Sequence, residues 1–140
     1  MAEADFYLID KPRFREEPLL LVCKLVQKAH AASMPVLVLA RDYAQADALD
    51  ELLWGFDADA MIPHQIAGDE GDDDVPVLVV PPEVDVPMRA LVVNLRDDPV
   101  ADGFQRVLEV VPADPAARTG SRQRWRAYQQ RGLTLKKHDM

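Results

Sequence analysis

The chain has 140 residues, of which 49% are hydrophobic, and a formal net charge of −8. This length and composition predict one domain, over residues 1–140, with its own apolar core. The negative charge argues against strong direct binding to nucleic acid, because phosphate would be repelled over most of the surface. The apolar run at residues 6–9 is too short for a signal peptide or a membrane span, so we expect a cytoplasmic protein that does not bind membranes.

The first forty residues predict a helix between two strands. Residues 6–9 form a compact apolar and aromatic run that is typical of a buried strand. Apolar residues then recur at helical spacing over residues 19–29, which predicts a helix that ends before Pro35. Residues 36–40 form a continuous apolar run, of the kind found in a parallel sheet that is covered on both faces.

A second helix is predicted after Asp42, which can cap its N-terminus together with Gln45 in a capping box. Apolar residues at helical spacing from residue 46 to residue 56 give this helix a buried stripe. Three further β-branched runs follow at residues 77–80, 90–93 and 107–111. This order predicts an α/β fold with an open, mostly parallel sheet of about five strands and helices on both faces.

Residues 68–75 are rich in glycine and aspartate, a composition that cannot bury apolar surface. The segment is therefore predicted to be a mobile loop. Clustered carboxylates suggest calcium, but the alternating ligands, central glycine and final glutamate of an EF-hand are absent from it. We expect no metal site.

The sequence lacks the patterns that nucleotide binding or catalysis would need. The first strand-to-helix turn, at residues 10–15, has no glycine, and no glycine-rich phosphate-binding pattern occurs elsewhere. Ser33 and Ser121 lie outside any nucleophile motif, and the histidines share no metal-ligand spacing. Cys23, the single cysteine, lies at helical core spacing and is expected to be buried. We therefore predict no catalytic residue and no cofactor.

A basic helix is predicted near the C-terminus, over residues 114–131. Residues 113–140 carry a net charge of +5, which leaves −13 for the rest of the chain. Helical spacing places Arg118, Arg122, Trp125 and Arg126 on one face. One interpretation is a docking site for a short acidic segment. The other is a solvated charged face on which Trp125 folds under the aliphatic stems of its neighbours.

A second surface is predicted where the second helix ends. Trp54 is followed by a loop that contains Met61, Ile62, Pro63 and His64. Met, Trp and apolar side chains clustered in a loop are typical of a protein interface. For His64 a plainer interpretation also stands, namely a loop histidine whose ring is satisfied by backbone groups.

Five groups of residues, in order along the chain, carry a resemblance to a known family. They are Phe6-Tyr7-Leu8 with Asp10; Gln45-Ala46, Leu49-Asp50-Glu51 and Leu53-Trp54; Pro63-His64 with Ala67-Gly68; Phe104 before Val107 and Val111-Pro112; and Arg122 with Trp125-Arg126-Ala127-Tyr128. Together they resemble the chi subunit of bacterial DNA polymerase III holoenzyme along nearly the whole chain.

This resemblance implies a non-catalytic, Rossmann-like α/β subunit that joins the clamp loader to single-stranded-DNA-binding protein. The acidic C-terminal tail of that protein, a run of aspartates ending in Ile-Pro-Phe, would bind at Arg118, Arg122, Trp125 and Arg126. The family often has Lys at the positions of Arg118 and Arg126, and Tyr at that of Trp125. The substitutions keep the charge and the flat ring but change the detailed geometry.

The resemblance also implies a separate face for the psi subunit of the clamp loader, at Trp54, Met61, Ile62, Pro63 and His64. The family has an aromatic residue where this chain has Met61. A helicase is a further candidate partner, and DNA would be reached only indirectly. The alternative, from another class, is a degenerate nucleotide-binding or hydrolytic α/β domain that uses the arginine patch to bind phosphate.

Overall fold

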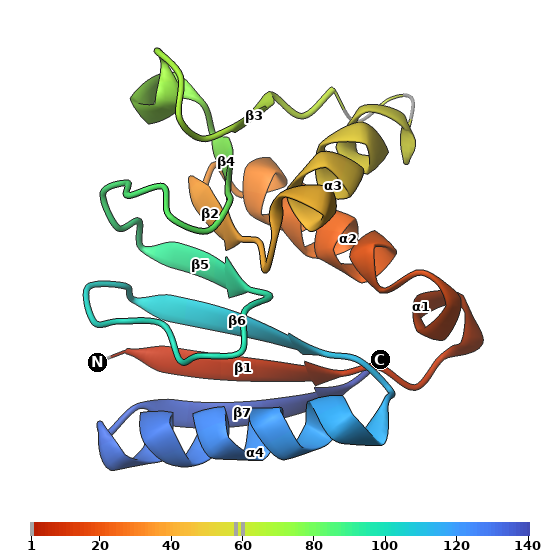
Figure 1. Ribbon diagram of the computed structural model, residues 1–140, viewed down its shortest axis with the longest axis vertical. Helices are drawn as coiled ribbons and strands as arrows, with labels where there is room; N and C mark the ends of the chain where they lie inside the picture. The colour runs from red at the N-terminus through yellow and green to blue at the C-terminus, as the bar shows by residue number, and fades with distance from the viewer. Residues whose placement is uncertain (1, 58, 60) are drawn as a thin grey trace.

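The strands form one sheet in this computed structural model, which describes residues 2–57, 59 and 61–140. The order across the sheet is β3-β4-β2-β5-β6-β1-β7, and all neighbouring strands are parallel (Figure 1). The strands are β1 (Glu3–Leu8), β2 (Val36–Leu39), β3 (His64–Ile66), β4 (Val77–Val80), β5 (Leu91–Asn94), β6 (Arg106–Val111) and β7 (Thr134–Asp139). The predicted open, parallel α/β fold is confirmed.

The described chain has seven strands rather than the predicted five, and the two additional strands lie at the edges of the sheet. β3 has only three residues, too few to show an alternating or continuous apolar pattern. β7 is polar, with the sequence Thr-Leu-Lys-Lys-His-Asp, and exposed lysines are common on edge strands. The predicted strand count was wrong because edge strands need not be apolar.

The described residues also form four α-helices: α1 (Pro12–Glu16), α2 (Pro18–Ala31), α3 (Tyr43–Gly55) and α4 (Pro115–Gln130). α3 begins as predicted, because the Asp42 side chain accepts a hydrogen bond from the Gln45 N–H at 2.7 Å. The Gln45 side chain in turn accepts from the Arg41 N–H at 2.7 Å. This bond lies one residue earlier than in a standard capping box. α1 occupies the first strand-to-helix turn, for which the sequence predicts no helix.

Helices cover both faces of the sheet and create two apolar cores. Because side chains alternate along a strand, Val36 and Val38 enter one core while Leu37 enters the other. The first core includes the inner sides of α2 and α3, with Cys23 fully buried as predicted. Burial raises the pKa of the Cys23 thiol to about 12. The second core includes Tyr128 of α4.

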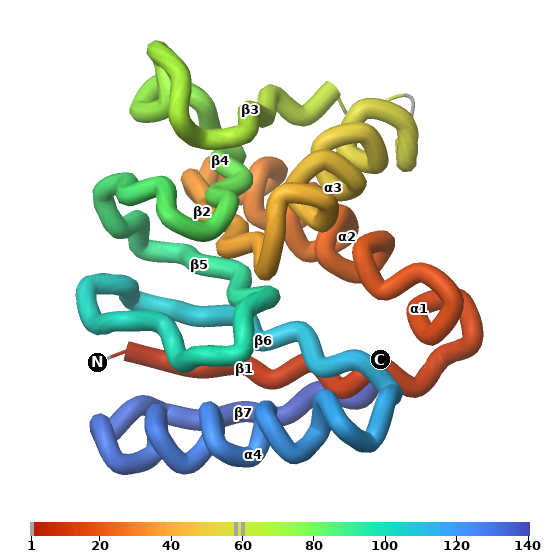
Figure 2. Tube along the Cα trace, viewed as in Figure 1, coloured from red at the N-terminus to blue at the C-terminus, as the bar shows by residue number. Residues whose placement is uncertain are grey.

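The two edges of the sheet lie at opposite ends of the molecule. Figure 2 shows the blue C-terminal strand β7 beside the red N-terminal strand β1, so the first and last strands of the chain lie side by side at one edge. At this end of the sheet α4 packs over one face, against β6 and β7, whereas α2 and α3 lie toward the β3 edge (Figure 1). Within the described part of the chain, no helix is long and apolar enough to cross a membrane.

A buried carboxylate ties β1 to the strands on either side of it. Asp5 on β1 is 2% exposed and accepts a hydrogen bond from Arg106 Nε of β6 at 2.6 Å. Its other oxygen lies 2.9 Å from His138 Nε2 of β7. Burial alone would raise the pKa of Asp5, but the hydrogen bonds from His138 and Arg106 outweigh burial and hold this pKa below its usual value. The carboxylate therefore stabilises the β7 edge in its charged form.

We expect Asp5→Asn to lower the free energy of unfolding at pH 7 by about 1–2 kcal/mol, because it weakens charge-assisted bonds to partly exposed partners. Since the folded pKa of Asp5 lies below the unfolded value of about 3.9, its contribution is present above that pH and is lost as the pH falls through the folded pKa. Urea unfolding at pH 7 and at pH 3 measures this. An equal difference between variant and wild type at both pH values would contradict it.

Candidate functional site

α4 begins at a capped N-terminus and is fixed on the sheet by one buried side. Pro115 occupies its first turn, and the Asp114 side chain accepts a hydrogen bond from the Ala116 N–H at 3.0 Å. Arg124 and Tyr128 are buried against the sheet. The helix lies within the range 114–131 of the predicted basic helix, and its buried side determines which of its arginines face solvent.

A buried polar network holds this side of α4. Arg124 Nε donates to Glu109 Oε1 at 2.8 Å, and the Tyr128 hydroxyl donates to Glu109 Oε2 at 2.6 Å. Asn94 Nδ2 also donates to Glu109 Oε2, at 2.8 Å. Glu109 is 0% exposed, so its charge is balanced entirely inside the protein. Arg124 is therefore a structural residue, although the sequence does not distinguish it from its neighbours.

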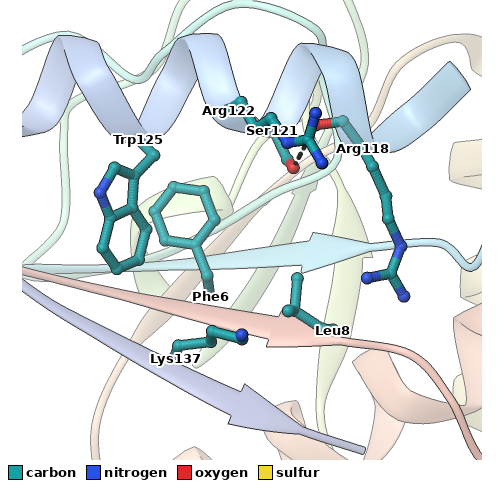
Figure 3. A pocket seen from close by; sticks show the side chains of 7 residues that line it. All are labelled: Phe6, Leu8, Arg118, Ser121, Arg122, Trp125 and Lys137. Carbon is teal, nitrogen blue, oxygen red and sulfur yellow. Dashed lines mark hydrogen bonds between the residues drawn. The ribbon is translucent and has the colours of Figure 1, made fainter. Parts of the chain in front are cut away.

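A pocket of about 320 Å³ lies between α4 and strands β1 and β7. Its walls come from three elements: Arg118, Ser121, Arg122 and Trp125 of α4, Phe6 and Leu8 of β1, and Lys137 of β7. Figure 3 shows Trp125 and Arg118 toward its two ends, with Phe6 and Leu8 between helix and sheet and Lys137 across from the helix. Lys137 is a lining residue that sequence reasoning missed, because β7 itself was missed.

The three cations of this pocket have no carboxylate partner among the residues that the structure describes. The Arg118 side chain makes a long contact, 3.4 Å from Nη2 to the Ile9 carbonyl. Within the described part of the chain, Arg122 and Lys137 form no ion pair. The neighbouring Lys136, by contrast, has a carboxylate oxygen 3.9 Å away. Unpaired cations beside an apolar floor suit a ligand that carries both carboxylates and an apolar group.

Trp125 is half-buried and forms a wall of the pocket. Its ring centroid lies 5.0 Å from that of Phe6, with the ring planes inclined at 61°. Arg126, the next residue, is turned by about 100° around the helix and is exposed outside the pocket lining. The structure therefore brings together three of the four residues of the predicted basic face, Arg118, Arg122 and Trp125.

The second predicted surface lies near the opposite edge of the sheet. Trp54 at the end of α3 is 70% exposed, and Met61 is 81% exposed. Met61 also has a positive φ of 41°, a left-handed conformation that is uncommon for a residue with a side chain. A large apolar side chain held out on unusual backbone is an observation that favours a contact function.

The remaining residues of this surface support it from inside. Ile62 is 4% exposed, and the His64 side chain is 0% exposed. His64 Nδ1 lies 2.8 Å from the Ile62 carbonyl oxygen, and Nε2 lies 3.1 Å from that of Asp50. The His64 ring centroid is 4.7 Å from that of Trp54. The contacts of His64 with backbone carbonyls agree with the plainer interpretation, and its Nε2 also lies 3.3 Å from a carboxylate oxygen of Asp50. Of the five predicted residues, Trp54, Met61 and Pro63 are exposed.

Another hollow, of about 260 Å³, lies at the carboxyl ends of β2, β5 and β6, where open α/β sheets commonly bind nucleotides. Arg96 in this hollow already donates to the carbonyls of Ala40 at 2.9 Å, Val80 at 2.9 Å and Pro81 at 3.0 Å. Arg124 is held by the buried network. Two of the three arginines of this hollow are therefore bonded within the protein, while Arg41 is exposed. The phosphate-binding alternative uses the arginine patch of α4 rather than this hollow, so it stays an alternative.

The acidic loop makes contacts within the chain. Asp72–Asp74 form a short 3₁₀ helix, η1. The Asp72 side chain accepts hydrogen bonds from the Gly68 N–H at 2.9 Å and from the Gln65 side chain, and Arg89 donates to the Asp72 carbonyl at 3.0 Å. These bonds give Asp72 partners within the chain, so its position is explained without a ligand. The mobility of the loop stays a prediction.

Fold and pocket together define a parallel α/β domain of the Rossmann-like type, with a cationic pocket at one edge and no glycine-rich phosphate loop in its sequence. Residues 1–136 match the family model described as DNA polymerase III chi subunit, HolC. The chain belongs to this family. It therefore has an accessory role in DNA polymerase III.

Individual relatives agree with this assignment. The chain is 35% identical over 142 residues to DNA polymerase III subunit chi of Pseudomonas aeruginosa, an alignment that covers 99% of this chain and 96% of that protein. It is 29% identical over 141 residues to the same subunit of Escherichia coli K12, with 96% of each covered. Among solved structures, the C-terminal domain of the DEAD-box protein Dbp5 matches with a TM-score of 0.65 and 9% identity, over 99% of this chain and 90% of that chain. The likeness to Dbp5 shows the fold alone.

Proposed function

We propose that this chain is a non-catalytic adaptor whose pocket between α4 and β7 binds the acidic C-terminal tail of single-stranded-DNA-binding protein. The observation that carries the proposal is the set of three cations, Arg118, Arg122 and Lys137, which have no carboxylate partner among the described residues and surround an apolar floor. This role extends the accessory role in DNA polymerase III. DNA is then reached through the partner protein, which agrees with the net charge of −8.

Each part of such a tail has a counterpart in the pocket. A guanidinium of Arg122 or Arg118 can donate two parallel hydrogen bonds to the terminal carboxylate. The phenyl ring of the last residue can pack against Trp125 and Phe6, which already meet edge to face. The preceding aspartates then lie near Lys137. Capture of a terminal carboxylate is a recurring mode of peptide recognition.

The second part of the proposal concerns the face at the other edge of the sheet. Trp54, Met61 and Pro63 contact the psi subunit of the clamp loader, while Ile62 and His64 hold them in place. β3 and β7 are opposite edges of the sheet, so the two partners have separate surfaces. A helicase is a further candidate partner of the chain.

Lys137→Ala tests the assignment of the pocket. We expect it to weaken binding of an acidic peptide with a free C-terminal Phe by about three- to tenfold, because one cation is lost from the pocket wall. Lys28→Ala is the matched control, since Lys28 is an exposed lysine on α2. Fluorescence anisotropy with a labelled peptide measures both affinities. Equal losses in the two variants would mean that only the overall charge matters, and no binding to the wild type would refute the proposed function.

Met61→Asp tests the second face. A carboxylate in an apolar contact is costly, so we expect binding of psi to weaken at least tenfold. The fold should persist, because Met61 is 81% exposed and Asp tolerates left-handed backbone. Met34→Asp, at another exposed methionine, is the control. Tail affinity should stay within about 0.5 kcal/mol of wild type in both variants. Loss of tail binding in folded Met61→Asp would contradict the two-face arrangement.

A further inference from the structure

β7 is an edge strand whose outer side has no neighbouring strand in the described part of the chain. Its inner side pairs with β1: the Thr134 N–H donates to the Ala2 carbonyl at 3.1 Å, and the Met140 N–H donates to the Leu8 carbonyl at 2.8 Å. Backbone groups alternate in direction along a strand. The backbone N–H and C=O groups of the even-numbered residues of β7 therefore point to β1, and those of the odd-numbered residues point outward.

Lys137 connects this free edge to the pocket. Its side chain lines the pocket, and its register partner on β1 is Phe6, which lies on the pocket floor. As an odd-numbered residue, Lys137 also presents its own N–H and C=O at the edge of the sheet. A peptide whose C-terminal residue is seated in the pocket would thus leave the pocket beside a strand that can still accept a partner.

The charges on β7 favour an acidic partner strand. Lys136 and Lys137 are consecutive, so their side chains lie on opposite faces of the sheet. A run of consecutive acidic residues in an added strand would likewise alternate between the two faces. On one face it would meet Lys137, and on the other Lys136, which lies 3.9 Å from a carboxylate oxygen of Glu3. Asp139, the one acidic residue of β7, lies at its C-terminal end, level with Leu8.

We propose that the acidic stretch of the bound tail adds to the sheet as an extra strand along the outer edge of β7. This inference rests on the proposed function, because it assumes that the pocket holds the C-terminal residue of the same peptide. Backbone hydrogen bonds to β7 supply part of the affinity, and the pocket supplies the selectivity for the terminal group. The edge thereby recognises an acidic peptide that continues beyond the pocket.

A second copy of this chain suits the edge less well. Pairing of β7 with β7 would bring the lysines of two copies together, and lysines on an edge strand normally prevent such pairing. An acidic strand reverses this effect, because the same lysines then attract it.

Alternate N-methylation of the peptide tests the proposal. The parent probe is an aspartate-rich peptide ending in Ile-Pro-Phe with a free carboxylate. One derivative is N-methylated at the odd-numbered aspartates, and the other at the even-numbered aspartates. Only one alternate set of amides can face β7, so one derivative should bind about tenfold more weakly while the other stays within about twofold of the parent. Equal affinities, or equal losses, would overturn the added strand while leaving the pocket assignment intact. A parent peptide that does not bind would overturn both.

Hydrogen exchange of the protein gives an independent readout. On peptide binding, the amides of Leu135 and Lys137 should exchange at least tenfold more slowly, whereas those of Lys136 and His138, which already face β1, should change little. No slowing at Lys137 in the saturated complex would overturn the proposal. So would slowing that rises with protein concentration in the absence of peptide, because it would assign the edge to a second copy.

Discussion

Arg122→Ala is expected to reduce the affinity for the acidic tail by about thirty- to a hundredfold, or about 2–3 kcal/mol, without unfolding the protein. Arg122 is exposed, lines the pocket and has no ion-pair partner among the described residues, so its removal costs little stability. Arg122→Lys should recover only part of the affinity, because an ammonium group lacks the planar fork of a guanidinium. Isothermal titration with the peptide measures all three proteins, and thermal melts confirm their folding.

A double-mutant cycle determines which group of the tail Arg122 binds. Amidation of the terminal carboxylate should weaken binding to the wild type far more than binding to Arg122→Ala, because both changes remove the same pair. Strictly additive losses would place Arg122 at the rim, where it acts as a general charge. The carboxylate would then belong to Arg118, the other arginine in the pocket lining.

Glu109→Leu is expected to lower the free energy of unfolding by about 3–5 kcal/mol, because it leaves the buried guanidinium of Arg124 without its carboxylate. The Tyr128 hydroxyl and the Asn94 amide lose an acceptor in the same step. The loss is a large part of the stability of an average domain. Urea unfolding at pH 7, followed by circular dichroism, gives the value.

The double variant Glu109→Leu/Arg124→Met separates the ion pair from the volume of the side chains. It should be more stable than Glu109→Leu alone, since an apolar pair of similar size replaces an unpaired buried charge. If the double variant loses the full sum of the losses measured for Glu109→Leu alone and Arg124→Met alone, the two groups are not coupled. The network would then not be what orients α4.

The central strands were predictable because burial on both faces of the sheet demands continuous apolar runs. Val77–Val80 matches its predicted range, and β2 and β6 differ from theirs by a single residue at one end. The start of α3 was predictable from the side-chain chemistry of Asp42. β3 and β7 were not predictable from apolar patterns. β3 has only three residues, and β7 is polar and is held in the sheet by its backbone pairing with β1.

The pocket shows a similar limit of sequence reasoning. Helical spacing identified Arg118, Arg122 and Trp125, but it also included Arg126 and gave no reason to separate Arg124. The signal for Arg124, which lies on α4, was present in β6. Glu109 interrupts the apolar run of that strand, and a carboxylate among buried residues needs a cationic partner. Lys137 had no such signal, since its place in the pocket depends on the register of β7 against β1.

The most direct test of the central claim compares single-stranded-DNA-binding protein with and without its C-terminal tail, each bound to single-stranded DNA. We expect wild-type chain to bind the tailed complex and not the tail-less one, and Arg122→Ala to bind the tailed complex at least thirtyfold more weakly. Surface plasmon resonance on immobilised complexes measures all four combinations. Equal binding of the wild type to both complexes, or tailed binding that Arg122→Ala leaves unchanged, would contradict the assignment of this pocket to the tail.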